Sequence, residues 1–290
     1  MGVKKSEVQG LQMRVAISGA KGFLGTALVK ELLESDFEVL ALTRGPPEST
    51  FSITHSKLTF VQVDYEDIAS LTKILTGCST VVHLAGIAHS KPAADDTERY
   101  WKAICEVTSN LARSSIDAGC ERFVFASTIK VYGEDSWSGA LTENSSLTPL
   151  TIYGQCKVEA EKLLINMSTE ISVHILRFPP MFGAGMRGSV KHIFNAARKK
   201  LPLPVFSFKH KRHFLYLENA VALLKASITG LMPKTLYNVY DPRPWSIGAF
   251  YDQVFQAVNR SNMPWFLKWR IPTFLENFLT RIHFLAPQKF

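Results

Sequence analysis

The fold is decided by the stretch Arg14-Val15-Ala16-Ile17-Ser18-Gly19-Ala20-Lys21-Gly22-Phe23-Leu24-Gly25. Its first five residues are a largely apolar run that predicts a β-strand, and residues 23–35 predict a helix from apolar positions spaced near 3.6. Glycines at three-residue intervals join the two elements. The first glycine can form a tight turn, the second lets a pyrophosphate approach the main chain, and the third permits close helix–strand packing.

A plain loop is the other interpretation of these glycines, but a strand before them and a helix after them favour a dinucleotide site. The start of the helix offers free N–H groups and a partial positive charge to phosphates. The candidate phosphate-binding residues are therefore Gly19, Gly22, Phe23, Leu24 and Gly25.

Strand and helix patterns alternate to about residue 177. Strands are predicted at Arg14–Ser18, Glu38–Thr43, Leu58–Val63, Thr80–Leu84, Arg122–Ala126 and Ser172–Arg177, and helices at 23–35, 66–76, 96–118 and 153–168. Such alternation is typical of an α/β protein with a Rossmann-type, doubly wound parallel sheet. We expect a dinucleotide-binding domain over residues 13–177 and a smaller C-terminal substrate lobe over residues 178–290, with some late segments returning to the sheet.

Charge is distributed unevenly along the 290 residues. The formal net charge is +8, with −4 in residues 1–177 and +12 in residues 178–290. The basic part suits nucleic acid, a membrane or an anionic small molecule. No nucleic-acid recognition motif accompanies it, so we expect no nucleic-acid partner. A hydrophobic content of 46% excludes a disordered chain, and four cysteines without metal-ligand spacing predict no metal site.

The residue after the second predicted strand bears on the choice of cofactor. An NAD site normally has Asp or Glu there, about 20 residues beyond the glycines, to bind the ribose 2′-hydroxyl. This chain has Arg44, whose guanidinium would attract a 2′-phosphate by charge and bidentate hydrogen bonds. A solvated surface arginine is the alternative. The sequence thus favours NADP(H) over NAD(H).

Two later segments carry reactive side chains. A predicted buried strand is followed by Ser127 and Thr128, and strand ends of this kind border the ligand crevice of a doubly wound sheet. Tyr153 and Lys157 are four residues apart at the start of a predicted helix, so both can face one side. An ammonium near a phenol lowers the pKa of the tyrosine, which suits an acid/base, and Thr128 can orient a reacting carbonyl. A partly exposed tyrosine beside a solvated lysine is the alternative.

Taken in order, these motifs resemble the extended short-chain dehydrogenase/reductases, also described as the NAD-dependent epimerase/dehydratase family. The resemblance runs from about Arg14 to about Pro244, through Gly19/Gly22/Gly25, His83-Leu84-Ala85-Gly86, Phe123–Gly133, Tyr153/Lys157, Leu176–Gly183 and Arg212–Leu223. It implies that Tyr153 is the catalytic acid/base, that Lys157 holds the nicotinamide ribose, and that Thr128 aids catalysis and contacts substrate. Further implied contacts are those of Asp64, Tyr65, Leu84, Ala85, Gly86 and Pro179 with the cofactor, and of Arg212 with the substrate diphosphate.

Departures from the family pattern favour one branch of it. Ile129-Lys130 replaces the Asp-Glu pair of dehydratases, which disfavours elimination. Pro179-Pro180 replaces the Asn common in epimerases, and Arg44 suits NADPH and net reduction. Three segments look most like bacterial UDP-4-keto-6-deoxy-N-acetylglucosamine 4-reductases of O-antigen synthesis: Ser127–Glu134, Arg177–Gly185 and Leu201–Pro204.

The function expected from this resemblance is the NADPH-dependent reduction of the 4-keto group of a UDP- or dTDP-sugar. The alternatives are a UDP-sugar 4-epimerase of the UDP-glucose 4-epimerase type and a non-catalytic NADP(H) sensor. Two further positions depart from the pattern. Ile104 stands where relatives have Asn, and Cys156, which stands where relatives have Ser, is interpreted as a small packing residue.

The segment Met263–Phe290 combines aromatic and basic residues. An amphipathic helix packed on the lobe is one interpretation, and peripheral contact with a membrane is the other. No apolar run reaches the ~18–20 residues of a membrane span, and the polar N-terminus lacks the apolar core of a signal peptide. We therefore expect a cytoplasmic protein, and the resemblance implies a homodimer.

Overall fold

The computed structural model describes residues 13–45, 51, 53–87, 97–133, 139–201 and 211–263. The chain divides into two compact units. The first comprises Met1–Pro179 and Leu217–Val239, and the second comprises Pro180–Tyr216 and Tyr240–Phe290. Residues 217–239 therefore belong to the same unit as the glycine-rich turn, although they lie late in the chain.

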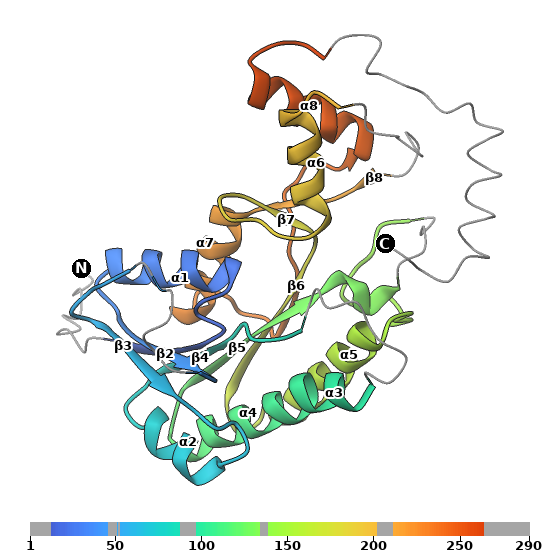
Figure 1. The fold of residues 1–290 in the computed structure, drawn as a ribbon. Helices are drawn as coiled ribbons and strands as arrows, with labels where there is room; N and C mark the ends of the chain where they lie inside the picture. The colour runs from blue at the N-terminus through green and yellow to red at the C-terminus, as the bar shows by residue number, and fades with distance from the viewer. Residues whose placement is uncertain are drawn as a thin grey trace, which may run out of the picture. The chain divides into compact units, whose positions relative to one another are not determined.

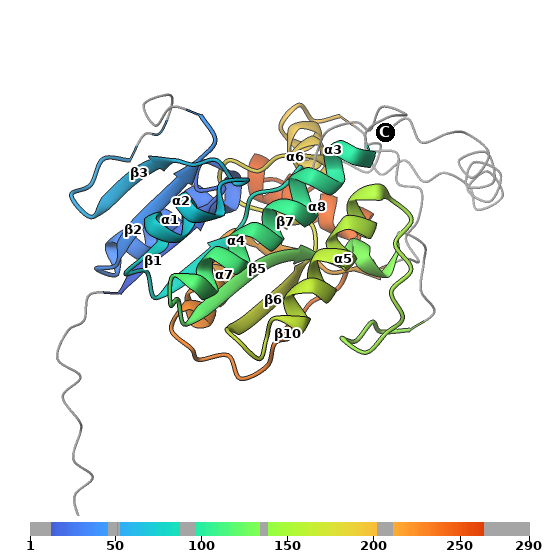
Figure 2. The same cartoon turned by 90° about the horizontal axis from the view of Figure 1, so that it is seen from below.

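A seven-stranded parallel sheet forms the centre of the first unit (Figures 1 and 2). Its strands are β1 (Arg14–Ser18), β2 (Glu38–Thr43), β3 (Leu58–Gln62), β4 (Thr80–His83), β5 (Arg122–Thr128), β6 (Ser172–Phe178) and β10 (Leu236–Asn238). They lie in the order β10-β6-β5-β4-β1-β2-β3. The strand order reverses between β1 and β4, as in doubly wound folds, and the predicted Rossmann-type α/β class is confirmed.

Helices cover both faces of this sheet. Figure 2 shows α2 (Ile68–Leu75), α4 (Val107–Asp117) and α5 (Ile152–Asn166) over one face, while α1 (Phe23–Glu34) and α7 (Leu217–Ile228) pack together on the other. The predicted helix over 96–118 is divided into α3 (Thr97–Trp101), a π-helical turn (Lys102–Glu106) and α4.

Because the inner strands of the sheet are covered on both faces, most of their residues are apolar and buried. The side chains of Val15, Ala16 and Ile17 on β1 and of Phe123, Val124 and Phe125 on β5 are fully buried. Local signals set the helix starts: the Asp67 carboxylate accepts a hydrogen bond from Ser70 N at 3.0 Å before α2, and the Thr151 hydroxyl accepts one from Gly154 N at 3.2 Å before α5.

The second unit is built on α6 (Ser189–Arg198) and α8 (Ile247–Asn259), which pack against each other. Phe250 of α8 stacks on Phe214 with ring centroids 4.0 Å apart. Two short strand pairs belong to this unit: β7 (Met181–Phe182) with β9 (Leu215–Tyr216), and β8 (Lys211–Arg212) with β11 (Trp245–Ser246). Within the described ranges, no helix has the length and apolarity to span a membrane. The predicted tail, apart from Met263, lies outside the described residues.

Candidate active site

The glycine-rich turn lies at the point where the strand order reverses, between the ends of β1 and β4. Gly19 has a φ of 75°, and a Cβ there would stand 2.7 Å from Ala85 N in the loop after β4. At Gly25 a Cβ would stand 2.2 Å from the Gly19 carbonyl oxygen. Neither position has room for a side chain, so the turn and the loop after β4 are in direct backbone contact.

The N-terminus of α1 follows this turn directly. Among the described residues, no side chain caps the helix, whose N-cap is Gly22. The first intrahelical bond runs from Thr26 N to Gly22 O at 2.9 Å, which leaves the N–H groups of Phe23, Leu24 and Gly25 outside the helical ladder. This cradle of small residues and free N–H groups fits the pyrophosphate of a dinucleotide.

Arg44, Asp64 and Tyr65 lie just beyond the ends of β2 and β3. The exposed Arg44 guanidinium lies 5.6 Å from the centroid of the buried Tyr65 ring, and the Arg44 carbonyl accepts a hydrogen bond from Gln62 Nε2 at 3.2 Å. The Asp64 carboxylate accepts one from Glu66 N at 2.9 Å. Burial raises the pKa of Tyr65 to about 12, and the Arg44 charge and a hydrogen bond with Ser18 oppose this shift.

A buried chain of hydrogen bonds runs from β1 through β4 to α4. His83 Nδ1 lies 2.5 Å from Ser18 Oγ, and His83 Nε2 lies 3.1 Å from Thr108 Oγ1. The Thr108 hydroxyl donates to the Ile104 carbonyl oxygen, so its own oxygen accepts from His83 Nε2–H. Nδ1 then carries no proton and accepts from Ser18. Sequence reasoning placed His83 in a motif but gave no role to it or to Ser18.

Burial keeps His83 neutral. The side chain is completely enclosed, and desolvation, followed by the positive charges of Lys157 and Arg44, lowers the pKa of His83 to about 3. A second contact of Ser18 Oγ is with Ala85 N at 3.4 Å. His83 therefore supports the junction between the glycine-rich turn and the loop Leu84-Ala85-Gly86.

Thr128 and Tyr153 come together at the end of β5. Thr128 is the last residue of that strand, and Tyr153 is the second residue of α5. A hydrogen bond joins their hydroxyl groups, which lowers the pKa of Tyr153, but burial of the phenol is the larger effect and raises that pKa to about 12. The phenol therefore keeps its proton at neutral pH.

Lys157 lies one helical turn after Tyr153 and is buried. Its ammonium donates to the Ala126 carbonyl oxygen at 2.7 Å and lies 4.2 Å from the centroid of the Phe125 ring. Desolvation lowers the pKa of Lys157 to about 8, and the Glu161 carboxylate opposes this shift. The predicted lowering of the Tyr153 pKa by Lys157 is wrong here, because the desolvation of the phenol dominates and the ammonium is directed to the β5 backbone.

The cysteine next to Lys157 packs against another cysteine. Cys105 of the π-helical turn donates through Sγ to the Cys156 carbonyl oxygen at 3.4 Å, and both side chains are buried. Burial raises the pKa of each thiol, that of Cys105 to about 12. Protonated, enclosed thiols fit the interpretation of Cys156 as a packing residue.

The other predicted residues are placed as follows. Gly86 adjoins Lys157, since a Cβ on Gly86 would stand 3.8 Å from Lys157 Nζ. Pro179 is the last residue of the first unit before the chain enters the second. Arg212 lies in the second unit, exposed on β8 and opposite Trp245 of β11. Its contact with a substrate diphosphate stays a prediction.

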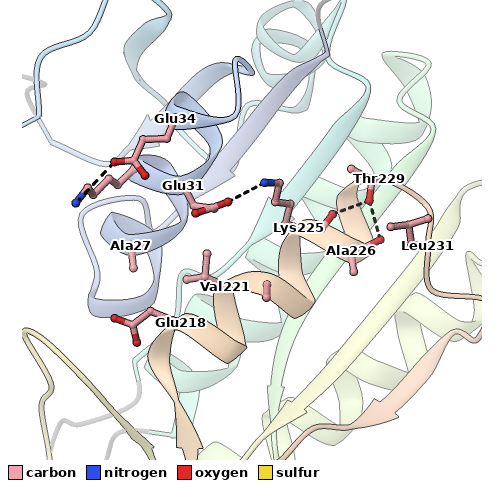
Figure 3. Close-up of a pocket in the computed structure, with 11 residues that line it drawn as sticks. Ala27, Glu31, Glu34, Glu218, Val221, Lys225, Ala226, Thr229 and Leu231 are labelled. Atoms are coloured by element: carbon pink, nitrogen blue, oxygen red, sulfur yellow. Dashed lines mark hydrogen bonds and ion pairs between the residues drawn. The ribbon is translucent and has the colours of Figure 1, made fainter. Parts of the chain in front are cut away.

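A surface groove lies elsewhere in the first unit, between α1 and α7 (Figure 3). Lys225 spans it, donating to Glu31 Oε1 at 2.7 Å and to Ser35 Oγ at 2.6 Å. Its described lining residues include none of the predicted site residues. The groove is thus distinct from the site around Tyr153.

The first unit has the architecture of an extended short-chain dehydrogenase/reductase. It combines a seven-stranded Rossmann-type sheet, a glycine-rich turn where the strand order reverses, and a Thr–Tyr–Lys group at the end of β5. Residues 15–239 match the model of the NAD-dependent epimerase/dehydratase family. The chain belongs to this family.

Two of the relatives that the chain resembles are named UDP-glucose 4-epimerases. The chain is 31% identical over 222 residues to a UDP-glucose 4-epimerase of Vibrio cholerae, covering 74% of this chain and 66% of that protein. It is 28% identical over 189 residues to the UDP-glucose 4-epimerase of Bacillus subtilis (strain 168), covering 61% of this chain and 56% of that protein. The alignment thus spans two thirds or less of either relative. Both names fit the epimerase alternative raised by the sequence.

Solved structures agree on the fold. The structure of MoeE5 in complex with UDP-glucose and NAD has a TM-score of 0.72 at 26% identity, over 86% of this chain and 83% of that one. A UDP-glucuronic acid 4-epimerase from Bacillus cereus, in complex with NAD, has a TM-score of 0.73 at 23% identity, over 87% and 85% of the two chains.

Proposed function

We propose that this protein reduces the 4-keto group of a UDP- or dTDP-sugar with NADPH, in the synthesis of a surface polysaccharide such as O-antigen. The observation that carries the proposal is the state of Tyr153. Its phenol is half-buried and hydrogen-bonded to Thr128 at the end of β5, and desolvation raises its pKa, which suits a proton donor. A reduction needs a proton donor at this place, whereas the first step of an epimerisation needs a base.

Each member of the group has a separate task in this reaction. The chemistry supplied by bound NADPH is a hydride, delivered to C4 of the keto sugar. Tyr153 donates its phenolic proton to the ketone oxygen, so the carbonyl becomes a secondary alcohol. Thr128 donates a hydrogen bond that orients the same oxygen. Lys157, held by the Ala126 carbonyl one turn along α5, is assigned the nicotinamide ribose.

Arg44 supports the choice of NADPH. Its guanidinium is exposed beyond the end of β2, where an NAD site normally has an acidic side chain. We assign to Arg44 the 2′-phosphate, to Asp64 and Tyr65 the adenine side, and to Leu84, Ala85 and Gly86 the pyrophosphate and ribose side of the cofactor. Pro179 is assigned a further contact with the cofactor. Arg212 is assigned the substrate diphosphate.

NADPH oxidation with a panel of UDP- and dTDP-4-keto sugars tests this function. We expect turnover by the wild-type protein and a loss of about 10²–10⁴-fold in Tyr153→Phe, since that variant lacks the proton donor but keeps the ring. NADPH affinity should be nearly unchanged in the variant. Absence of turnover with every sugar, or turnover by Tyr153→Phe at the wild-type rate, would contradict the proposal.

UDP-sugar 4-epimerisation is the second candidate, and the names of the relatives favour it. Incubation with UDP-glucose or UDP-N-acetylglucosamine without added NADPH separates it from reduction, because an epimerase forms the C4 epimer under those conditions. NADPH binding without either reaction would indicate a sensor. We also propose a cytoplasmic homodimer, with membrane contact by the C-terminal tail as a separate question for vesicle cosedimentation.

A further inference from the structure

A buried ion pair lies beside the Thr128–Tyr153–Lys157 group. Arg177 of β6 donates from Nε to both Glu161 oxygens at 3.1 Å and from Nη2 to Glu161 Oε2 at 2.5 Å. The two side chains are only 3% and 2% exposed. A buried pair of this kind is weak evidence for stability, since removing two charges from water offsets much of their attraction. Stability alone therefore does not account for this buried pair.

The Glu161 carboxylate connects three elements of the first unit. It lies on α5, one turn after Lys157, binds Arg177 of β6, and accepts a hydrogen bond from the Ser127 hydroxyl of β5. Ser127 directly precedes Thr128. The carboxylate therefore fixes the strand end that carries Thr128 against the helix that carries Tyr153 and Lys157.

Arg177 also contacts Tyr132. Its Nη1 donates to the Tyr132 hydroxyl at 2.5 Å, and that hydroxyl donates to Asn238 Oδ1 at 2.7 Å on β10. The Tyr132 ring lies 4.8 Å from the guanidinium carbon. With hydrogen bonds on both sides, the guanidinium remains next to the Glu161 carboxylate.

The surroundings of Lys157 make Glu161 its main electrostatic support. On α5 it is faced by Tyr153, Cys156 and Glu161, the π-helical turn contributes Cys105, and β4 contributes the neutral His83. The Ala126 carbonyl and the Phe125 ring of β5 complete the environment. Both thiols are protonated, so of these groups Glu161 is the one that carries a negative charge at neutral pH.

We propose that Glu161, held by Arg177 of β6 and Ser127 of β5, is a positioning residue that places its carboxylate one helical turn from Lys157 as the counter-charge of the ammonium and fixes the end of β5 beside Tyr153. The inference rests on the proposed function only for the catalytic meaning of Lys157. The charge relation between Glu161 and Lys157 is a property of the protein alone and is measured without substrate.

Lysine NMR tests this directly. Protein with ¹³C at the lysine ε-carbons is titrated, and the Lys157 signal is assigned by its absence in Lys157→Met. In Glu161→Gln, which keeps the shape and an acceptor for Ser127, we expect the Lys157 midpoint to fall by about one pH unit or more. The matched control is Glu159→Gln, which removes a 44%-exposed carboxylate, paired with Lys162, from the same helix and should leave the midpoint unchanged.

A double variant covers the case in which Glu161→Gln does not fold, because removing both charges of a buried pair is better tolerated than removing one. In Glu161→Gln/Arg177→Gln the Lys157 midpoint should again fall. An unchanged midpoint in either folded variant, or an equal shift in Glu159→Gln, would overturn the inference.

Activity adds a second readout. If the wild-type protein turns over a keto sugar, the alkaline limb of its kcat profile should move to lower pH in Glu161→Gln by the same amount as the Lys157 midpoint. If no sugar is turned over, the proposed function fails, while the NMR titration still decides the role of Glu161.

Discussion

Replacing Lys157 with Met should stabilise the protein while abolishing its turnover. The ammonium is buried, and its desolvation is the main reason why its pKa falls from 10.5 to about 8. A lowered pKa for a base means that the folded protein binds this proton more weakly than the unfolded chain does. Folding is therefore opposed by Lys157 at every pH at which the unfolded lysine is charged.

The magnitude follows from the same two values. At about 1.4 kcal/mol per pH unit, the interval between 10.5 and about 8 corresponds to about 3 kcal/mol of lost stability at neutral pH. Met fills a similar volume and has no charge to desolvate. The Ala126 carbonyl loses the ammonium as a donor, which offsets about 1 kcal/mol. We expect a net gain of about 2 kcal/mol in the free energy of unfolding.

Urea unfolding of both proteins at several pH values measures this. The advantage of Lys157→Met should be full below about pH 8 and should shrink as the pH rises toward 10.5, since the unfolded wild-type chain then loses its proton as well. A variant less stable than the wild type at pH 7, or an advantage that does not change between pH 8 and 10.5, would refute the reasoning.

Two further substitutions test the cradle and its support. Gly25→Ala places a Cβ 2.2 Å from the Gly19 carbonyl oxygen, so it should lower the free energy of unfolding by about 1–3 kcal/mol and weaken NADPH binding in a fluorescence titration. Gly77→Ala is the control, because Gly77 has a φ of +83° and no described atom within 4 Å of the added Cβ. This variant should lose about 1 kcal/mol to backbone strain and bind NADPH as the wild type does. Between pH 6 and 4 the wild-type protein should lose about 1.4 kcal/mol of unfolding free energy per pH unit through His83, because this histidine gains a proton there only in the unfolded chain. His83→Gln should lack this contribution, so its stability should fall less steeply with decreasing pH. Equal slopes in urea unfolding would contradict the enclosed, neutral state of His83.

The sequence was sufficient for the strands and helices that alternate regularly. Six of the seven strands in the main sheet were predicted to within two residues, because parallel strands covered on both faces are continuous apolar runs. The seventh strand, β10, has three residues in a segment rich in turns and joins the sheet through pairing with β6, which local pattern does not encode. The division of 96–118 by a π-helical turn is likewise set by tertiary packing.

The candidate site was predictable where one motif contains the chemistry. Tyr153 and Lys157 stand a turn apart on α5, and Thr128 was placed at the end of a strand beside a crevice. The electrostatic state of these residues was not predictable, because it depends on burial by other elements. Spacing alone suggested a lowered Tyr153 pKa, whereas desolvation of the half-buried phenol raises it. Glu161 and Arg177 are 16 residues apart and meet only when α5 packs on β6.

The buried charges at this site have a common consequence. Lys157 weakens folding, and so would Glu161 or Arg177 if either stood alone in the interior. Enclosed together, Glu161 satisfies Arg177, and its negative charge opposes the loss of the proton from Lys157. The buried charge of Lys157 is thus balanced by that of Glu161, which is in turn paired with Arg177. Replacing Lys157 should therefore stabilise the fold and remove turnover, whereas replacing Glu161 or Arg177 alone leaves a buried charge without its partner and should destabilise the fold.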